Sequence, residues 1–288
     1  ATIKDGGVAA TLKALSDVSA ADALTFKTTD TTVKAADLVA LDSKLAGGTF
    51  DATRVSKITG EAKDVSSIIS ALALTIASNA TLNVSGALTV AELNSIVTGN
   101  AANAVITATV QANAAEELAK LTTTAVAGDS IALTVNGSTA LATDLALIIA
   151  ATTGKIKLEA TEVRGNVAEL NVVYTTNKAQ FTALGNENII LTDTPSATVL
   201  NGFAAATTGK VTATLIPSTS IDQTTVKALK DVKTSDNITL VSSITTLVGT
   251  KDNLNALLAI KKLIPNANFD KVAALTAVDA KDVAIVKN

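Results

Sequence analysis

Short runs of alternating apolar and polar residues recur along the chain. In the run IALTVN, Ile131, Leu133 and Val135 occupy every second position. A period of two is the pattern of a β-strand that is buried on one face only. The pattern predicts strands over residues 80–86, 104–110, 131–136, 155–161, 188–193, 210–216 and 238–243.

Helical patterns with their own start signals lie between these strands. Residues 89–92 (TVAE) form a capping-box sequence, and Leu93, Ile96 and Val97 follow at helical spacing. The sequence NAAE at 113–116 opens a similar segment. Further helices are expected over 139–152, 165–174, 196–206 and 222–232. Three glycines follow predicted helices, where a left-handed C-cap is expected: Gly128, Gly154 and Gly209.

The predicted strands are roughly evenly spaced. Equivalent apolar positions, beginning with Leu82, Ile106 and Ile131, follow one another at steps of 22–33 residues. One strand–helix unit is unstable alone, because a helix of about ten residues is marginal and a single strand leaves backbone groups unpaired. Stacking supplies partners to both elements. The sequence therefore predicts an α/β fold, a one-sided parallel β/α solenoid of about ten strand–helix units in two layers.

A doubly wound α/β domain, with helices on both faces of its sheet, is the alternative. Its central strands would be buried on both faces and would read as continuous Val, Ile and Leu runs. Here the second face of most strands carries Thr, Asn, Lys or Glu, which favours the one-sided arrangement. Outward threonines such as Thr107 and Thr134 suit a solvated strand. A regular Thr array could also order ice-like water, but Asn83, Lys157 and Glu159 interrupt it.

The C-terminal part of the chain has a different pattern. We expect solenoid repeats over residues 1–249 and, in the same continuous domain, an amphipathic helix and a partial repeat over 250–288. The stretch 251–264 reads as the longest helix of the chain, and Pro265 ends it. The helix either caps the exposed end of the stack or forms an assembly contact, and the cap is slightly favoured.

The same segment supplies the candidate assembly residues. The sequence 269–283 aligns with 50–65 with one gap, so the chain is expected to end part-way through a unit. That half-unit, 278–288, is the candidate docking edge, and the first unit, 6–30, is the receiving edge. The predicted assembly residues are Leu254, Leu257, Leu258, Val283 and Ile285.

Composition removes most enzymatic chemistry. The 288-residue chain has no Cys, His, Met or Trp, so the commonest general base, thiolate nucleophiles and disulfides are missing. No phosphate-binding loop or coupled nucleophile–base motif occurs. We therefore expect no enzyme and no catalytic, cofactor or metal residues. Calcium is left open, although neither the twelve-residue EF loop nor the glycine–aspartate nonapeptide is present.

Charge and hydropathy argue against nucleic acid and the membrane interior as partners. The net charge is −3, which gives no basic surface for nucleic acid. The longest strongly apolar run, 145–151, is much shorter than the roughly 20 residues of a spanning helix, so no membrane insertion is expected. Only 2% of residues are aromatic, so the core must consist of Ala, Val, Leu and Ile. The missing initiator Met indicates a processed precursor or a segment of a longer polypeptide.

Three stretches resemble a known repeat: ITGEAKDVSSI (58–68), VKAADLVALDSKLAGGTFDATRVS (33–56) and residues 167–215, which contain LGNENIILTD. That repeat occurs in giant cyanobacterial cell-surface and secreted proteins and in some virion structural proteins of viruses that infect those cells. Its pattern joins an ITG-x-A-x-D-V helix start, a GLGNE-x-x-x-LSD strand and an AADL-x-x-LD helix. The resemblance implies an extended surface, motility-related, adhesive or lattice-forming role, and it carries over no catalytic residues.

These observations lead to two functional expectations. The first is a non-enzymatic structural protein of an extracellular surface layer, sheath, filament or virion exterior, which self-associates head to tail or in a lattice. The second is an adhesin, or binding module, that recognises a glycan or a cell-surface protein through its polar sheet face. Such surfaces usually carry exposed aromatic residues. With Tyr174 as the only Tyr and no Trp, the chain is poorly equipped for this role.

Overall fold

The computed structural model describes residues 1–17, 23–45, 48–70, 74–77, 80–100, 104–122, 129–215, 223–240, 246–248, 251–265 and 274–276. The chain is an α/β protein with ten α-helices in these residues. It divides into two compact units. The first comprises residues 1–135 and 147–157, and the second comprises residues 136–146 and 158–288.

Two parallel sheets build the first unit. One has the strand order β1-β3-β5, and the other contains the order β11-β9-β7-β6-β4-β2, with β8 paired to β9. The strands are β1 (Phe26–Lys27), β2 (Thr32–Lys34), β3 (Phe50–Ala52), β4 (Lys57–Glu61), β5 (Leu74–Ile76), β6 (Thr81–Leu88), β7 (Val105–Val110), β8 (Asn113–Ala114), β9 (Ser130–Asn136) and β11 (Ile156–Leu158).

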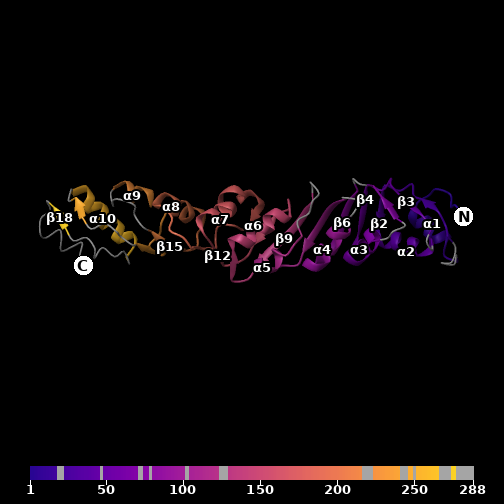
Figure 1. Ribbon diagram of the computed structural model, residues 1–288, viewed down its shortest axis with the longest axis horizontal. Helices are drawn as coiled ribbons and strands as arrows, with labels where there is room; N and C mark the ends of the chain where they lie inside the picture. Colours follow the sequence, from indigo (N-terminus) through magenta and orange to yellow (C-terminus); the bar gives the residue numbers. More distant parts are fainter. Residues whose placement is uncertain are drawn as a thin grey trace. The chain divides into compact units, whose positions relative to one another are not determined.

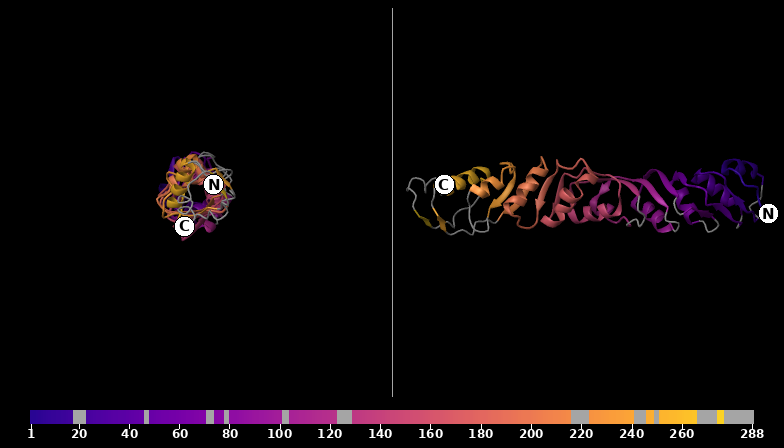
Figure 2. Two further views of the ribbon diagram at one scale, coloured as in Figure 1. Left: turned by 90° about the vertical axis from the view of Figure 1, so that its left-hand side faces the viewer. Right: turned by 90° about the horizontal axis from the view of Figure 1, so that it is seen from above.

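The first four helices of the first unit pack against their neighbours in the sequence. They are α1 (Val8–Ala14), α2 (Ala35–Leu45), α3 (Ala62–Ser70), α4 (Val90–Gly99) and α5 (Ala115–Leu118). Helix α1 contacts α2, α2 contacts α3, and α3 contacts α4. The ribbon views show α2, α3 and α4 side by side along the first unit (Figures 1 and 2).

Strand pairing in the first unit keeps a nearly constant register. Val33, Ile58, Leu82 and Ile106 form one row of Cα partners across β2, β4, β6 and β7. In the other sheet, β1, β3 and β5 pair in parallel in the same manner. The pairs β1 and β2, β3 and β4, and β5 and β6 therefore each add one strand to each of the two sheets.

This arrangement corrects the expected unit of one strand and one helix. In the first unit, the segments from β1 to α4 contain two strands before each helix. The strands β1, β3 and β5 have two or three residues each, which is too short for an alternating pattern to be recognised in the sequence.

The second unit contains a parallel sheet of order β10-β12-β14-β15-β16 and a pair β17-β18. Its strands are β10 (Thr139–Leu141), β12 (Glu162–Gly165), β13 (Phe181–Thr182), β14 (Asn188–Leu191), β15 (Val211–Leu215), β16 (Asn237–Leu240), β17 (Thr246–Val248) and β18 (Ala274–Thr276). Its helices are α7 (Val167–Asn171), the π-helix η1 (Val172–Thr176), the 3-10 helix η2 (Lys178–Gln180), α8 (Ala197–Ala206), α9 (Gln223–Ala228) and α10 (Lys251–Leu263). Helix α6 (Ala142–Ala151) contains residues of both units.

The seven strands predicted from alternation are confirmed as β6, β7, β9, β11, β14, β15 and β16. Strands β11 and β14 are shorter than expected, and the predicted ends of the last two, residues 216 and 241–243, lie outside the described residues. The capping box at Thr89 forms as predicted, since its side chain accepts from the N–H of Glu92 and the Glu92 carboxylate accepts from the N–H of Thr89. Ser196 likewise caps α8. Two predicted helix starts were wrong. The NAAE sequence at 113–116 does not form a capping box, because the residue before α5 is Ala114, which has no side-chain cap. The helix expected from residue 139 is preceded by a strand, because residues 139–141 form β10.

Glycines after helices play a different role from the predicted one. Gly154 and Gly209 do not have positive φ angles, whereas Gly137 and Gly185 do. A Cβ on Gly154 would overlap the backbone of Ile131, near the start of β9. A Cβ on Gly209 would overlap the backbone of Glu187, just before β14. These glycines therefore allow two backbones to approach closely. Gly128 lies outside the described residues.

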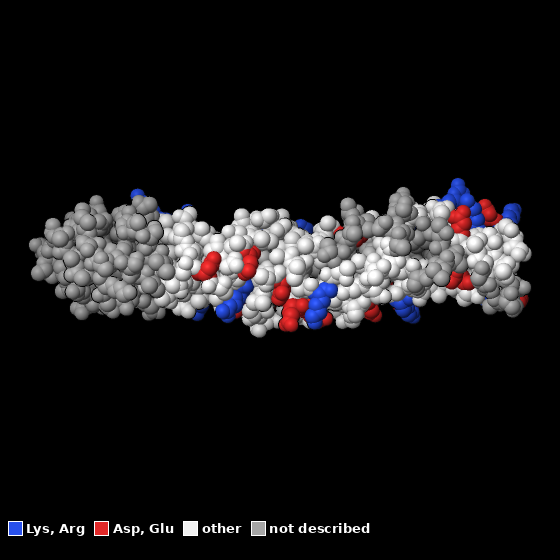
Figure 3. Space-filling view, viewed as in Figure 1, with Lys and Arg blue, Asp and Glu red and all other residues white. Residues whose placement is uncertain are grey.

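The core consists mainly of Ala, Val, Leu and Ile, as composition predicts. Four of the six aromatic side chains form two pairs. The Phe26 and Phe50 rings, partners in adjacent strands, have centroids 5.3 Å apart, and the Tyr174 and Phe203 rings meet edge to face at 6.2 Å. On the face drawn in Figure 3, acidic and basic side chains of the described residues are interspersed rather than gathered by sign.

Candidate functional site

A bulge in β6 distinguishes one place in the first unit. Asn83 pairs with Thr107, but Ala87, four residues on, pairs with Thr109, only two residues on. Two additional residues of β6 therefore lie opposite β7. Gly86 in this bulge has a φ of 81°, the left-handed conformation that glycine adopts readily. Bulges of this kind redirect side chains and are frequent beside binding sites.

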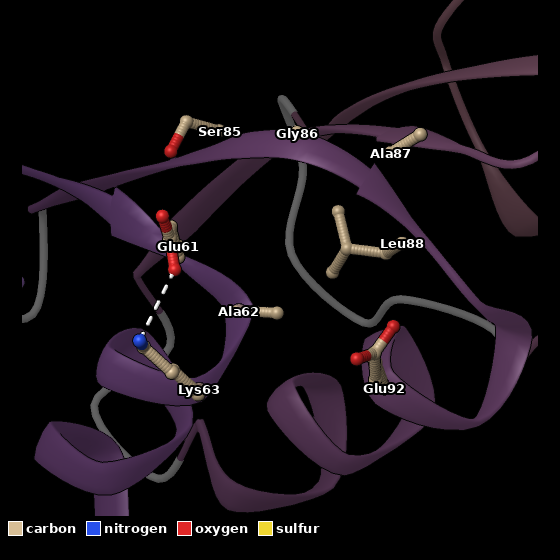
Figure 4. A pocket seen from close by; sticks show the side chains of 8 residues that line it. All are labelled: Glu61, Ala62, Lys63, Ser85, Gly86, Ala87, Leu88 and Glu92. Carbon is tan, nitrogen blue, oxygen red and sulfur yellow. Dashed lines mark ion pairs between the residues drawn. The ribbon is translucent and has the colours of Figure 1, made fainter.

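A cavity of about 340 Å³ lies beside the bulge. It is formed by the end of β4, the first turn of α3, the bulge of β6 and the first turn of α4 (Figure 4). Its lining residues are Glu61, Ala62, Lys63, Ser85, Gly86, Ala87, Leu88 and Glu92. In Figure 4 the side chains of Ala62 and Leu88 point into the space between the strands and the helices, and the Glu92 carboxylate faces it from α4.

The two carboxylates of the cavity are held in different ways. Glu92 Oε2 accepts hydrogen bonds from the Thr89 N–H at 2.8 Å and from Thr89 Oγ1 at 2.9 Å. These bonds, first from the backbone N–H and then from the hydroxyl, lower the pKa of Glu92. Glu61 forms an exposed ion pair with Lys63, with Oε2 and Nζ 3.4 Å apart. The cavity therefore offers hydrogen-bond acceptors and one cationic donor.

This lining offers groups suited to binding. Ser85 is the hydroxyl of the cavity, and the chain contains no His or Cys that could activate it or act as a nucleophile. Within the described residues, no group of three or more acidic, His or Cys side chains is placed to hold a metal ion.

A second cluster explains the LGNE sequence of the second unit. The carboxylate of Glu187, a residue only 2% exposed, accepts from the Tyr174 hydroxyl at 2.5 Å and from the N–H groups of Gly185 and Asn186. Burial first, and then the Glu187 charge, raise the pKa of Tyr174 far above its usual range. Ala183, just before this turn, has a φ of 61°. The cluster holds together the turn that precedes β14.

Side chains of one repeat hydrogen-bond the backbone of another in both units. Asp30 Oδ2 accepts from the N–H of Val8 at 2.7 Å, at the start of α1, whose N-cap Gly7 has no side chain to do so. Asp193 accepts in the same way from Val167 at the start of α7. These aspartates follow one strand of a repeat and cap the helix of the preceding repeat.

Asparagines provide a second bond of this kind. Asn94 on α4 donates to the carbonyl of Lys120 at 2.9 Å and accepts from the N–H of Thr122 at 2.7 Å. Asn201 on α8 makes a similar two-bond contact with Asp231. Each amide thus joins a helix to the segment that follows the next helix in the sequence.

The predicted assembly residues are only partly within the described structure. Leu258 lies in α10 and is half-buried, while the residues of α10 and its end that are fully buried are Ala256, Ile260 and Ile264. Leu254 and Leu257 lie in α10, but their side chains are outside the described part. Val283, Ile285 and the half-unit over 278–288 also lie outside it.

Comparisons with known proteins add no relative. No family model, no curated protein and no solved structure matches the chain. Among the described residues, no helix is long and apolar enough to cross a membrane.

Sequence reasoning missed the cavity beside β6. The strand was expected over 80–86, and its bulge gives only one local signal, the dipeptide Ser85-Gly86 inside an alternating run. Glycine inside a strand pattern often marks a bulge. The sequence identifies Glu92 as a capping-box residue. That Glu92 also lines a cavity depends on tertiary structure, which the local pattern does not contain.

Proposed function

We propose that the chain is a non-enzymatic structural protein whose α/β repeats stack as a one-sided solenoid. It builds an extracellular surface layer, sheath, filament or virion exterior by self-association. The supporting observation is the row of Cα partners that joins Val33, Ile58, Leu82 and Ile106. Each strand pairs with the strand of the next repeat, so that every added repeat presents an edge of the same kind.

Helix packing supports the one-sided form of this proposal. In a doubly wound domain, helices that follow each other in the chain can lie on opposite faces of the sheet. Here α1 contacts α2, α2 contacts α3, and α3 contacts α4. Consecutive helices on one face, together with strands in constant register, are the arrangement that a stack of repeats requires.

The aspartate and asparagine contacts support stacking at the level of single residues. Asp30 and Asp193 cap helices that begin 22 and 26 residues before them, respectively. Asn94 and Asn201 reach segments 26 and 30 residues further on. Because such bonds join one repeat to the next, each repeat is stabilised in part by its neighbours.

The place of action outside the cell is proposed from the resemblance of residues 33–68 and 167–215 to surface-protein repeats. Head-to-tail growth would join the docking edge over 278–288 to the receiving edge over 6–30. The partner in this account is a second copy of the chain.

Self-association is tested by size-exclusion chromatography with light scattering over a wide concentration range, followed by electron microscopy. We expect masses that rise with concentration, and fibres or a lattice in micrographs, with or without calcium. The double variant Val283→Asp, Ile285→Asp should remain monomeric while keeping the far-ultraviolet circular dichroism of the parent chain. A parent chain that stays monomeric at the highest concentration, in both the presence and absence of calcium, would contradict the proposal.

A further inference from the structure

We propose that the cavity beside the Ser85–Gly86 bulge binds a neutral, polyhydroxylated ligand, such as one sugar unit of a glycan. This inference goes beyond the scaffold function, because a stack of repeats needs regular strands and gains nothing from a bulge at this position. The cavity volume of about 340 Å³ falls at the lower end of the range of about 300–1,000 Å³ found for small-molecule sites.

The bulge is a local departure from an otherwise regular strand. On its other side, β6 stays in register with β4, where Gly60 pairs with Val84 and Glu61 with Ser85. The two additional residues therefore affect only the side that faces β7. A Cβ on Gly86 would meet no atom within 4 Å, so the backbone conformation, and not crowding, requires glycine here. The open space around Gly86 is available to a ligand.

The Glu92 carboxylate is oriented before any ligand arrives. Two hydrogen bonds from Thr89 hold Oε2, so the carboxylate cannot turn freely. Its other oxygen, Oε1, remains available to accept a hydrogen bond from a hydroxyl group in the cavity. An acceptor that is fixed in advance loses little conformational entropy on binding.

The charges in the cavity favour a neutral ligand. The Lys63 ammonium, 3.4 Å from the Glu61 carboxylate, disfavours a second cation at that wall. Glu61 and Glu92 together disfavour an anion. A hydroxyl group suits both kinds of wall, because it donates to a carboxylate and accepts from an ammonium. Ala62 and Ala87 supply an accessible apolar surface for the C–H face of a sugar ring, and Leu88, which is only 1% exposed, closes the cavity from behind.

Nuclear magnetic resonance of the full chain tests this site. The probes are the methyl glycosides of glucose, galactose, mannose and N-acetylglucosamine, each added up to about 50 mM, an upper limit chosen for weak, millimolar affinity. Calcium chloride and sodium phosphate form separate arms. We expect at least one sugar to shift the amide signals of Ser85, Gly86 and Ala87 saturably, and neither salt to do so.

Two variants assign the binding to the cavity. Glu61→Gln and Glu92→Gln each remove a charged acceptor, and we expect binding about tenfold weaker in each. Glutamine can still serve in a capping box, so Glu92→Gln should keep α4 intact. The matched control is Glu169→Gln, which changes the equivalent capping box of α7 and should leave binding unchanged.

The outcomes separate this inference from the scaffold function. Shifts at residues 85–87 with calcium alone would replace the sugar site with a cation site, and shifts with phosphate alone would replace it with an anion site. No shift with any sugar, or binding in Glu61→Gln and Glu92→Gln as tight as in the parent chain, would overturn the proposal. None of these results bears on self-association, which is measured by mass and microscopy.

Discussion

Asp193 accepts hydrogen bonds of 3.0 and 3.1 Å from the backbone N–H of Val167, which precedes it by 26 residues and opens α7. The first N–H groups of a helix have no partner within the helix. Here the next repeat supplies the acceptor, and Asp30 does the same for Val8 in the first unit. The helix start of one repeat is therefore completed by a side chain of another.

Removal of this cap should destabilise the second unit measurably. We expect Asp193→Ala to lower the free energy of unfolding by about 1 kcal/mol, the usual effect of losing a helix cap. Asp193→Asn is the matched control, because it keeps an acceptor oxygen and should lose less. Urea denaturation followed by circular dichroism measures both. Equal stability of the parent chain and Asp193→Ala would show that the contact is not stabilising.

Tyr174 should resist ionisation for as long as the protein stays folded. The burial of its ring and the negative charge of Glu187 raise its pKa, so the neutral form is favoured in the native state. The contribution of the neutral Tyr174 side chain to the stability of the fold is present below pH 10, the pKa of an unfolded Tyr. It is lost as pH rises above 10, because the unfolded chain then ionises before the folded chain does. Because the chain has one Tyr and no Trp, the ultraviolet absorbance of tyrosinate reports this residue alone.

We expect no tyrosinate signal near pH 11 in the folded chain and full ionisation in urea. Tyr174→Phe should cost about 1–3 kcal/mol of stability, because it leaves the buried Glu187 carboxylate without one donor. Ionisation near pH 10 in the folded chain would contradict the buried pair.

Asp51 should titrate unusually low for a partly exposed carboxyl group. The Thr53 hydroxyl, the Thr53 N–H and then the Lys27 ammonium lower its pKa to about 2. Since the folded pKa is depressed, the stabilisation is present above pH 3.8 and disappears as pH falls towards 2. We expect Thr53→Ala to raise the pKa of Asp51 more than Lys27→Ala does, measured by carboxyl carbon resonance against pH. The opposite order would assign the shift to the ion pair.

Glycine substitutions distinguish close backbone approach from simple helix propensity. A Cβ on Gly154 or Gly209 would overlap a neighbouring backbone, so Gly154→Ala and Gly209→Ala should each destabilise the fold by more than 1 kcal/mol. Gly202 in α8 is the control: a Cβ there meets nothing within 4 Å. Gly202→Ala should stabilise by about 0.5–1 kcal/mol. Thermal unfolding of the three variants gives the comparison, and loss of stability in all three would contradict it.

The sequence predicted the longer elements and missed the short ones for identifiable reasons. In β7, Ile106, Ala108 and Val110 are buried and alternate with polar residues, so the period of two is visible. In β1 and β3, Phe26 and Phe50 are buried but have too few neighbours to define a period. The role of Gly154 was mistaken because its partner, Ile131, is adjacent only in the folded chain.

The candidate site was less accessible to prediction than the fold. The capping box of Glu92 is a local sequence pattern, and it was found. The cavity depends on the end of β4 lying beside the bulge of β6, and such a relationship requires the register between strands. Likewise, the acidic residues Asp30 and Asp193 gave no signal of helix capping, because the helices they cap lie in the preceding repeat.

Removal of one complete repeat tests the stacking of repeats most directly. Leu82 and Ile106 are register partners, so deleting residues 82–105 places Ile106 where Leu82 pairs with Ile58. A stack of repeats predicts that this shortened chain folds, with cooperative urea unfolding and native-like circular dichroism, whereas deletion of residues 82–93 alone abolishes cooperative unfolding. Loss of cooperative folding in the chain that lacks the whole repeat, or equal behaviour of the two deletions, would contradict the account.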